Sequence, residues 1–228
     1  MYHSGVSRAL FAQRCVAVFF LIAAIPLGYL LPEWFGWENG PIELTQDVVL
    51  FLGLFLAVSW YVSGQDLLDN WVWLAIAPLW VLCIGRELSW GAVLRAPLDM
   101  TDIGPWYSSS VLWYKPYVYP FLALVITLSA GIFLLNKGWR SIFDMMKERA
   151  MPWAELVLMA GCLIMLTAAE RHYGLFGSWT SGAAQVSEEL AELGVYLCLL
   201  GGQSRIRLFQ IDKSVIGAKV SIWPAKSS

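Results

Sequence analysis

Six apolar stretches, each close to the length needed to cross a bilayer, constrain the fold of this chain more than any other feature. The hydrocarbon core of a membrane is about 30 Å thick, so a helix rising about 1.5 Å per residue needs roughly 20 apolar residues to span it. The composition agrees, because 58% of the 228 residues are hydrophobic and 14% are charged, whereas soluble domains are about a quarter charged. The expected spans cover residues 15–31, 47–64, 70–90, 116–136, 152–172 and 181–201.

This pattern predicts an all-α membrane protein with six transmembrane helices. It argues against a disordered chain and against a typical soluble enzyme. With 15 Lys and Arg against 17 Asp and Glu, it also argues against a nucleic-acid partner held by bulk positive charge. The partner that this composition requires is the lipid bilayer.

The basic residues are distributed unevenly between the two sides of the expected bundle. If the N-terminus faces the cytoplasm, 11 of the 15 fall on that side, and such a bias is the main determinant of orientation. We therefore expect an integral protein of the bacterial inner (plasma) membrane with both termini in the cytoplasm. The first apolar run is too long for a signal peptide and is expected to remain as the first span. The basic residues on the cytoplasmic side are Arg8, Arg14, Lys137, Arg140, Lys147, Arg149, Arg205, Arg207, Lys213, Lys219 and Lys226.

Residues that favour helix ends set the expected limits of the spans. Asp47 is expected to cap the start of the second span, because its side chain suits that position. Gly201 and Gly202 are expected to end the sixth span. This divides the chain into a six-helix transmembrane domain over residues 1–202 and a basic cytoplasmic tail over residues 203–228.

Charged residues gather near the outer ends of three expected spans, although a charge inside a membrane helix is costly and calls for a partner or a function. The third span ends with an arginine–glutamate pair, and the fifth ends with a glutamate, an arginine and a histidine. The sixth span begins with three glutamates, so the three spans bring their charges to one depth. The residues of this candidate polar pocket are Arg86, Glu87, Glu170, Arg171, His172, Glu188, Glu189 and Glu192.

The spacing of the polar residues in the sixth span places most of them on one helix face. Gln185, Glu188, Glu192 and Tyr196 follow an i, i+3/i+4 pattern. Glu189 lies one position away from that face. Carboxylates at these spacings repel one another, so the helix needs counter-ions, bound cations or protonated acids.

Two interpretations of the pocket differ in what neutralises the acids. In a structural interpretation, Arg86 and Arg171 pair with two carboxylates and hold the spans together. Five glutamates outnumber these two arginines by three, so the remaining acids must be solvated, protonated or bound to a cation. In a binding interpretation, Glu188, Glu192 and His172 hold a divalent metal ion such as Ca²⁺, Mg²⁺ or Zn²⁺.

The choice of cofactor is limited by the histidines and the motifs. His3 and His172 are the two histidines of the chain, so neither a multi-histidine metal site nor a bis-histidine haem is expected. The motifs of a serine-hydrolase elbow, a P-loop and a dinucleotide site are absent as functional motifs. A divalent cation is therefore the candidate cofactor, and no haem or nucleotide site is supported.

Other functions are compatible with the same pocket. Two carboxylates with His172 could carry out acid–base chemistry on a lipid or lipid-linked substrate, with Arg86 and Arg171 binding its phosphate. Protonatable acids inside a bundle also suit an ion- or proton-coupled transporter. An assembly subunit of a membrane complex would use the pocket to bind an outer-leaflet lipid or a membrane-protein partner. The sequence assigns no catalytic residue, so it does not decide whether the chain is an enzyme.

Overall fold

The chain folds into a helical bundle with one small antiparallel sheet, seen in a computed structural model that describes residues 2–64, 70–101, 104–169 and 180–221. The all-α prediction is confirmed. The α-helices are α1 (Tyr2–Leu30), α2 (Pro41–Ser63), α3 (Trp71–Glu87), α4 (Lys115–Leu135), α5 (Gly138–Lys147), α6 (Trp153–Ala169) and α7 (Ser181–Ser221). The shorter elements are η1 (Glu33–Gly36), η2 (Ser89–Leu94), β1 (Asp99–Thr101), β2 (Gly104–Trp106) and η3 (Ser109–Val111).

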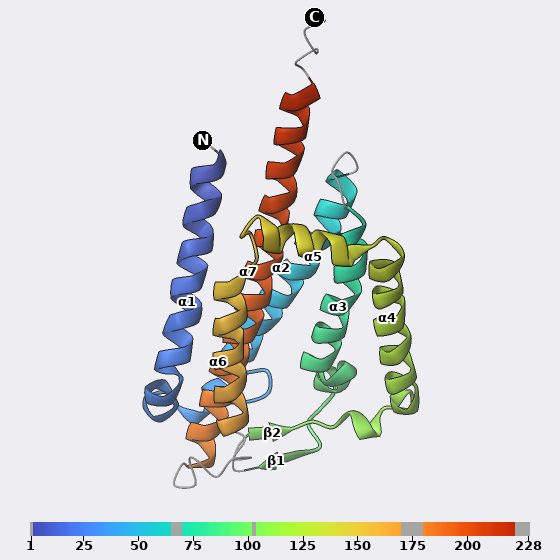
Figure 1. Ribbon diagram of the computed structural model, residues 1–228. Coiled ribbons are helices and arrows are strands. Elements are labelled where there is room, and N and C mark those ends of the chain that lie inside the picture. The colour runs from blue at the N-terminus through green and yellow to red at the C-terminus, as the bar shows by residue number, and fades with distance from the viewer. Residues whose placement is uncertain (1, 65–69, 102–103, 170–179, 222–228) are drawn as a thin grey trace, which may run out of the picture.

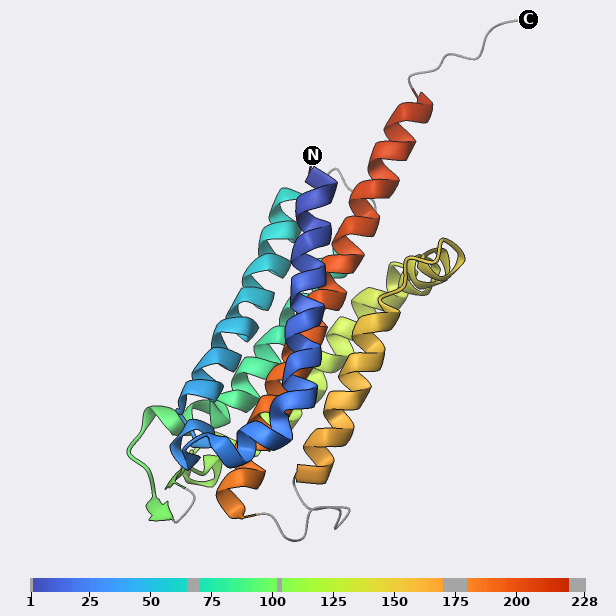
Figure 2. The same cartoon turned by 90° about the vertical axis from the view of Figure 1, so that its left-hand side faces the viewer.

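The long helices run along the bundle, and α5 crosses one end of it (Figure 1). The β1–β2 hairpin lies at the opposite end (Figure 1). Helix α7 packs against α1, α6 and α2 and extends past the other helices toward the C-terminus (Figure 2). Because α7 carries Glu189 and Glu192, its central position shields these acids from the surroundings.

Within the described parts of the chain, three segments are long and apolar enough to cross a membrane. They are Leu10–Leu30, Glu33–Ser63 and Lys115–Leu135, and Trp153–Ala169 is a shorter apolar helix. Large apolar side chains cover much of the outer surface, as in α4, where Leu135 is 84% exposed. An apolar exterior around helices whose backbone groups are bonded internally is what a bilayer requires.

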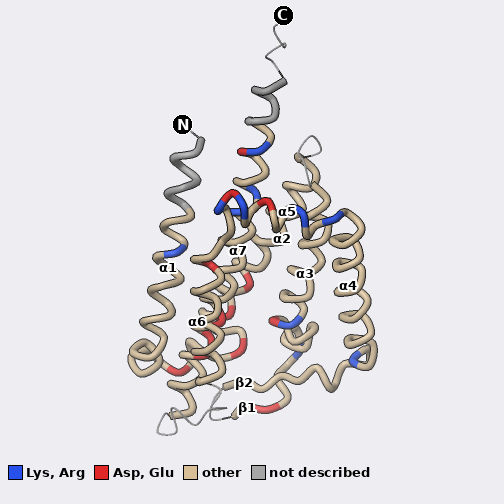
Figure 3. Tube along the Cα trace, viewed as in Figure 1, with Lys and Arg blue, Asp and Glu red and all other residues tan. Residues whose placement is uncertain are grey.

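The start of α1 and the end of α7 lie at the same end of the bundle (Figure 1). Basic residues gather at this end, on α5 and on the neighbouring part of α7, while acidic residues lie mainly deeper in the bundle (Figure 3). The two ends therefore differ in charge, as the distribution of Lys and Arg along the sequence indicates.

Two expected helix ends are wrong. Helix α7 continues through Gly201 and Gly202, because glycine inside a helix costs only about 1 kcal/mol. A Cβ at Gly201 would lie 3.2 Å from Cγ of Glu155 in α6, so the glycine allows a close approach of the two helices. The expected domain boundary at residue 202 thus falls within α7. Helix α2 begins at Pro41, so Asp47 lies inside the helix and does not cap it.

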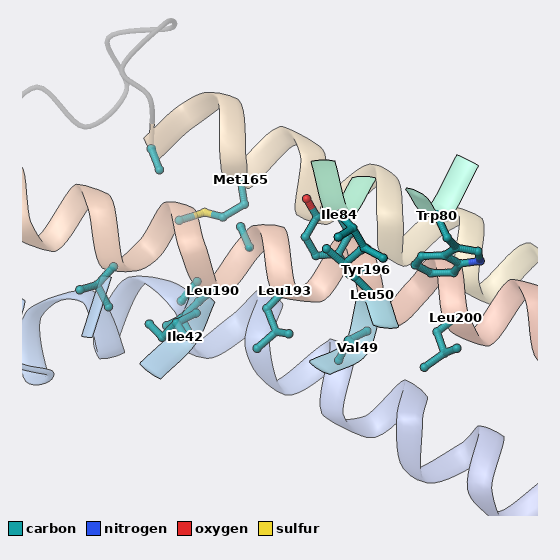
Figure 4. Packing of buried hydrophobic residues seen from close by; sticks show 14 of the residues in the cluster. Ile42, Val49, Leu50, Trp80, Ile84, Met165, Leu190, Leu193, Tyr196 and Leu200 are labelled. Carbon is teal, nitrogen blue, oxygen red and sulfur yellow. The ribbon is translucent and has the colours of Figure 1, made fainter. Parts of the chain in front are cut away.

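Polar residues recur every seven positions along α7, and each faces α2 or α3. A seven-residue spacing keeps residues on one side of a helix that packs against its neighbours as in a coiled coil. The apolar core surrounds this stripe, and Figure 4 shows Tyr196 beside Ile84 and Leu50. The four residues of the stripe are Glu189, Tyr196, Gln203 and Gln210.

The middle of the stripe joins all three helices through the amide of Gln203. This side chain accepts a hydrogen bond from Nε1 of Trp80 in α3 and donates one to the carbonyl of Gly53 in α2, at 3.0 Å. Seven residues further along α7, Gln210 accepts a hydrogen bond of 3.0 Å from Nε1 of Trp73. These buried bonds fix how far α7 is shifted along α2 and α3, since a shift would leave the amides unpaired.

Candidate functional site

The candidate site lies where the end of α3 meets α7, and it is organised around Arg86. The last turn of α3 carries Arg86, whose Nη1 donates hydrogen bonds to Glu192 of α7 and, at 2.9 Å, to the hydroxyl of Tyr196. The same nitrogen lies 3.8 Å from Oε2 of Glu87. The Arg86 side chain is 59% exposed, whereas those of Glu87 and Glu192 are 6% and 9% exposed. The cation therefore lies at the surface of the site and the acids lie beneath it.

The Tyr196 hydroxyl connects the two buried acids. It lies 2.7 Å from Oε2 of Glu87 and 2.8 Å from Oε1 of Glu192, and its single proton serves one of these carboxylates at a time. Tyr196 is itself buried. The hydroxyl thus holds a carboxylate of α3 and a carboxylate of α7 close together despite their like charge.

Gln46 of α2 supports the third acid of the site. Its Nε2 donates to the backbone carbonyl of Glu189 at 2.8 Å and to the Glu189 carboxylate at 2.9 Å. The side chain is fully buried, and its Oε1 has no hydrogen-bond partner among the described residues. A buried acceptor without a partner is costly, so a bound cation or donor beside this oxygen would be stabilised.

Three carboxylates meet at this point. Glu87, Glu189 and Glu192 each place an oxygen within 4.8 Å of the other two. Glu43 and Asp47 of α2 lie within electrostatic reach of Glu87 and add to the negative charge. Among the described residues, Arg86 neutralises one of the three clustered carboxylates, so the described part of the group keeps an excess of negative charge in a largely buried place.

Such a group can hold a hard cation. Ca²⁺ binds oxygen ligands at about 2.3–2.6 Å, so two oxygens on opposite sides of one ion lie at most about 5 Å apart. The separations in the cluster of Glu87, Glu189 and Glu192 are within this limit. Carboxylates with an amide oxygen nearby, here that of Gln46, make up the oxygen-rich ligand set that Ca²⁺ prefers.

The structure brings together part of the pocket expected from the sequence. Arg86, Glu87, Glu189 and Glu192 meet, whereas Glu188 is partly exposed and lies outside the group of three acids found among the described residues. The expected metal ligands Glu188 and Glu192 are therefore not the pair that clusters. The remaining expected members lie outside the described residues, and they are Glu170, Arg171 and His172.

Gln46 is the residue of the site that sequence reasoning missed. A glutamine next to Asp47 at the start of an apolar segment resembles part of a helix end. Gln46 carries no charge, and the face pattern of α7 does not indicate that Gln46 belongs to the site. The missed signal is a seven-residue spacing on three helices, which predicts one shared seam. The positions are 46, 53 and 60 in α2, 73, 80 and 87 in α3, and 189, 196, 203 and 210 in α7.

No protein family, curated protein or solved structure matches this chain. The arguments for its function therefore come from its own residues and their geometry.

Proposed function

We propose that this chain is a six-span membrane protein, with both termini on the cytoplasmic side, that binds a divalent cation at the carboxylate cluster between α3 and α7. The observation that carries the proposal is the meeting of Glu87, Glu189 and Glu192 within 4.8 Å beside Arg86. Because all the clustered atoms are oxygens, Ca²⁺ is favoured over softer metals such as Zn²⁺. The cluster lies at the end of the bundle away from the termini, which is the outer end in this orientation.

Arg86 has room to give way to the ion. Its side chain is 59% exposed, so the guanidinium can turn away from Glu192 into the polar interface at little cost. The released carboxylate of Glu192 then binds the cation. In the absence of the ion, Arg86 and the Tyr196 hydroxyl stabilise part of the negative charge of the carboxylates.

The rest of the α7 stripe supports binding more than transport. A transporter needs a polar route past Tyr196 toward the termini. The next polar positions, Gln203 and Gln210, come at intervals of seven residues, about 10.5 Å along the helix. Each is bonded to a tryptophan of α3, which suits a role in helix register.

Calcium titration of the purified full chain in detergent tests the proposal. We expect Ca²⁺ to raise the melting temperature and to bind in isothermal calorimetry, with a stabilisation of about 2.7 kcal/mol when Ca²⁺ is at 100 times its Kd. Glu189→Gln and Glu192→Gln should each abolish the calcium-dependent rise in melting temperature. Glu148→Gln, which changes a half-exposed acid directly after α5, is the matched control and should respond to Ca²⁺ like the wild type.

A different result would favour the structural interpretation. If Ca²⁺, Mg²⁺ and Mn²⁺ leave the melting temperature of the wild type unchanged while both glutamine variants are destabilised, the cluster only holds the helices together. Membrane placement is tested separately by extraction with alkaline carbonate and by a C-terminal reporter that is active only in the cytoplasm. An extractable protein or a silent reporter would contradict the proposed placement.

A further inference from the structure

An apolar groove lies between α3 and α4 beneath α5, far from the carboxylate cluster. Its volume is about 490 Å³, within the range of about 300–1,000 Å³ found for ligand pockets. Leu79 of α3, Ile126 and Phe133 of α4 and Ile142 of α5 line it. Leu79, Ile126 and Ile142 are exposed, so the groove is open along its side to the surroundings of the bundle.

The groove continues into a smaller hollow at the side of α5, where a glutamine and a lysine join the apolar lining. This hollow of about 30 Å³ is lined by Gln210 and Lys213 of α7 and shares Ser141, Met145 and Ile206 with the groove. Lys213 forms an ion pair with Asp144 of α5, at 2.6 Å. The cavity therefore passes from hydrocarbon walls to a lysine as it approaches the end of the bundle that holds the termini.

Ser129 of α4 supplies an independent sign of a ligand. It lines the groove and is 5% exposed, and its hydroxyl has no hydrogen-bond partner among the described residues. A buried hydroxyl usually finds a partner, because leaving it unpaired is costly. Ser129 lies six residues before the end of α4, which is about 9 Å along the helix from the end of the bundle that α5 crosses. An oxygen of the occupant at this depth would satisfy the hydroxyl.

The charge around the polar end favours an anionic occupant. Between residues 137 and 149 the chain carries four basic residues and two acidic ones, and Lys213 adds a further positive charge. Helix α5 also exposes the apolar side chains of Trp139, Ile142 and Phe143. A helix with both kinds of side chain suits the membrane–water interface, where basic pockets between helices bind the headgroups of anionic lipids.

We infer that this groove binds an anionic glycerophospholipid. One acyl chain lies along Leu79, Ile126 and Phe133, an ester oxygen accepts a hydrogen bond from Ser129, and the phosphate pairs with Lys213. Asp144 competes with the phosphate for Lys213. The inference rests on the proposed membrane placement of the bundle, and it is independent of cation binding at Glu87, Glu189 and Glu192.

Native mass spectrometry of the detergent-purified full chain tests the inference by titration with phosphatidylglycerol and phosphatidylcholine of identical acyl chains. We expect tighter binding of phosphatidylglycerol. Lys213→Gln should weaken phosphatidylglycerol binding about fivefold and phosphatidylcholine binding by less, because the choline cation offsets the phosphate charge that both lipids carry. Asp144→Asn should strengthen phosphatidylglycerol binding. Ala130→Trp should close the groove and abolish binding of both lipids. Ala123→Trp, on the same helix but outside the groove, is the matched control and should bind both normally.

Several outcomes would overturn the inference. Equal wild-type affinity for the two lipids, which carry the same phosphodiester, would show that net negative charge does not contribute to binding and would contradict an anionic occupant. Unchanged lipid binding by Ala130→Trp, with the wild-type elution volume in size exclusion, would place the lipid elsewhere. Carbonate extraction of the chain from membranes would instead contradict the membrane placement itself, which separates that failure from the failure of the groove.

Discussion

Arg86 in the last turn of α3 forms an ion pair with Glu192, which lies 106 positions later in α7. The arginine is the more exposed partner, and the glutamate lies beside two further carboxylates, Glu87 and Glu189. The pair joins two helices, and within the described parts of the chain it compensates one of the three clustered carboxylates. Both properties can be tested by removing the positive charge.

Arg86→Gln is expected to have opposite effects on stability and on calcium binding. Without calcium the variant should lose about 1–3 kcal/mol of unfolding free energy, because a buried carboxylate loses its charged donor. Its calcium affinity should rise, because the competing cation is gone. Thermal unfolding and calorimetry measure the two effects, with Arg95→Gln in the exposed loop after η2 as the control. Weaker calcium binding by Arg86→Gln would contradict the cation site.

Gln46→Leu is expected to destabilise the bundle by about 1–3 kcal/mol, because the carbonyl and carboxylate of Glu189 lose a buried donor. Denaturant titration followed by tryptophan fluorescence measures the loss. Thr45→Val alters the neighbouring residue, which is exposed and bonds only within α2, and should change stability by less than about 0.5 kcal/mol. Equal effects of the two substitutions would show that the Gln46 bonds contribute little.

Gly53→Ala is expected to disturb the seam between α2 and α3. A Cβ at Gly53 would lie 2.6 Å from the indole ring of Trp80, and overpacking of this kind costs about 1–3 kcal/mol. Gly131→Ala is the matched control, because nothing lies within 4 Å of its Cβ position. The control should be stabilised by about 0.5–1 kcal/mol through higher helix propensity. Thermal unfolding should show a lower melting temperature for Gly53→Ala and a higher one for Gly131→Ala.

The contact between α5 and α7 is expected to weaken in acid. The hydrogen bond from Lys213 lowers the pKa of Asp144 below its ordinary value of 3.8. Because the folded-state pKa is the lower one, the ion pair contributes fully above pH 3.8 and is lost as the pH falls through the lowered pKa. Amide hydrogen exchange in α5, corrected for intrinsic rates, should therefore be steady above about pH 4 and accelerate as the pH falls further through the lowered pKa of Asp144.

Asp144→Asn separates this effect from a general response to acid. The variant should exchange faster in α5 already at pH 5 and should show no further acceleration that depends on the ion pair. Asp99→Asn, at the opposite end of the bundle, should retain the wild-type profile. An α5 profile that is the same for the wild type and Asp144→Asn would mean that the ion pair does not hold α5.

The apolar helices and the approximate place of the charges could be predicted from the sequence, because both depend on local properties. Helix α5 (Gly138–Lys147) was not predicted, since it is short and contains no long apolar run. A run of about 20 apolar residues forms a helix in a membrane-like interior, since each backbone group must be bonded within its own segment. Charges near the ends of such runs then fall at similar depths through the helix rise alone. This is sufficient to bring Arg86 and Glu87 to the level of Glu192.

The tertiary structure decided which carboxylates meet. Glu188 and Glu189 are adjacent, but they differ by about 100° around the helix axis. The rotation of α7 is set by the packing of Leu190 and Leu193 in the core and by the hydrogen bonds of the seven-residue stripe. This rotation places Glu189 against Gln46 and leaves Glu188 outside the group of three acids.

The end of α7 was also decided by packing. Two consecutive glycines predict a helix end when only local preference counts. In the bundle, Gly201 allows Glu155 to come close, and the helix continues so that Gln203 and Gln210 reach the tryptophans of α3. The sequence determined which long apolar segments are helical and how deep their charges lie, since these follow from length and polarity. The rotation and the length of α7 depend on contacts between residues far apart in the chain.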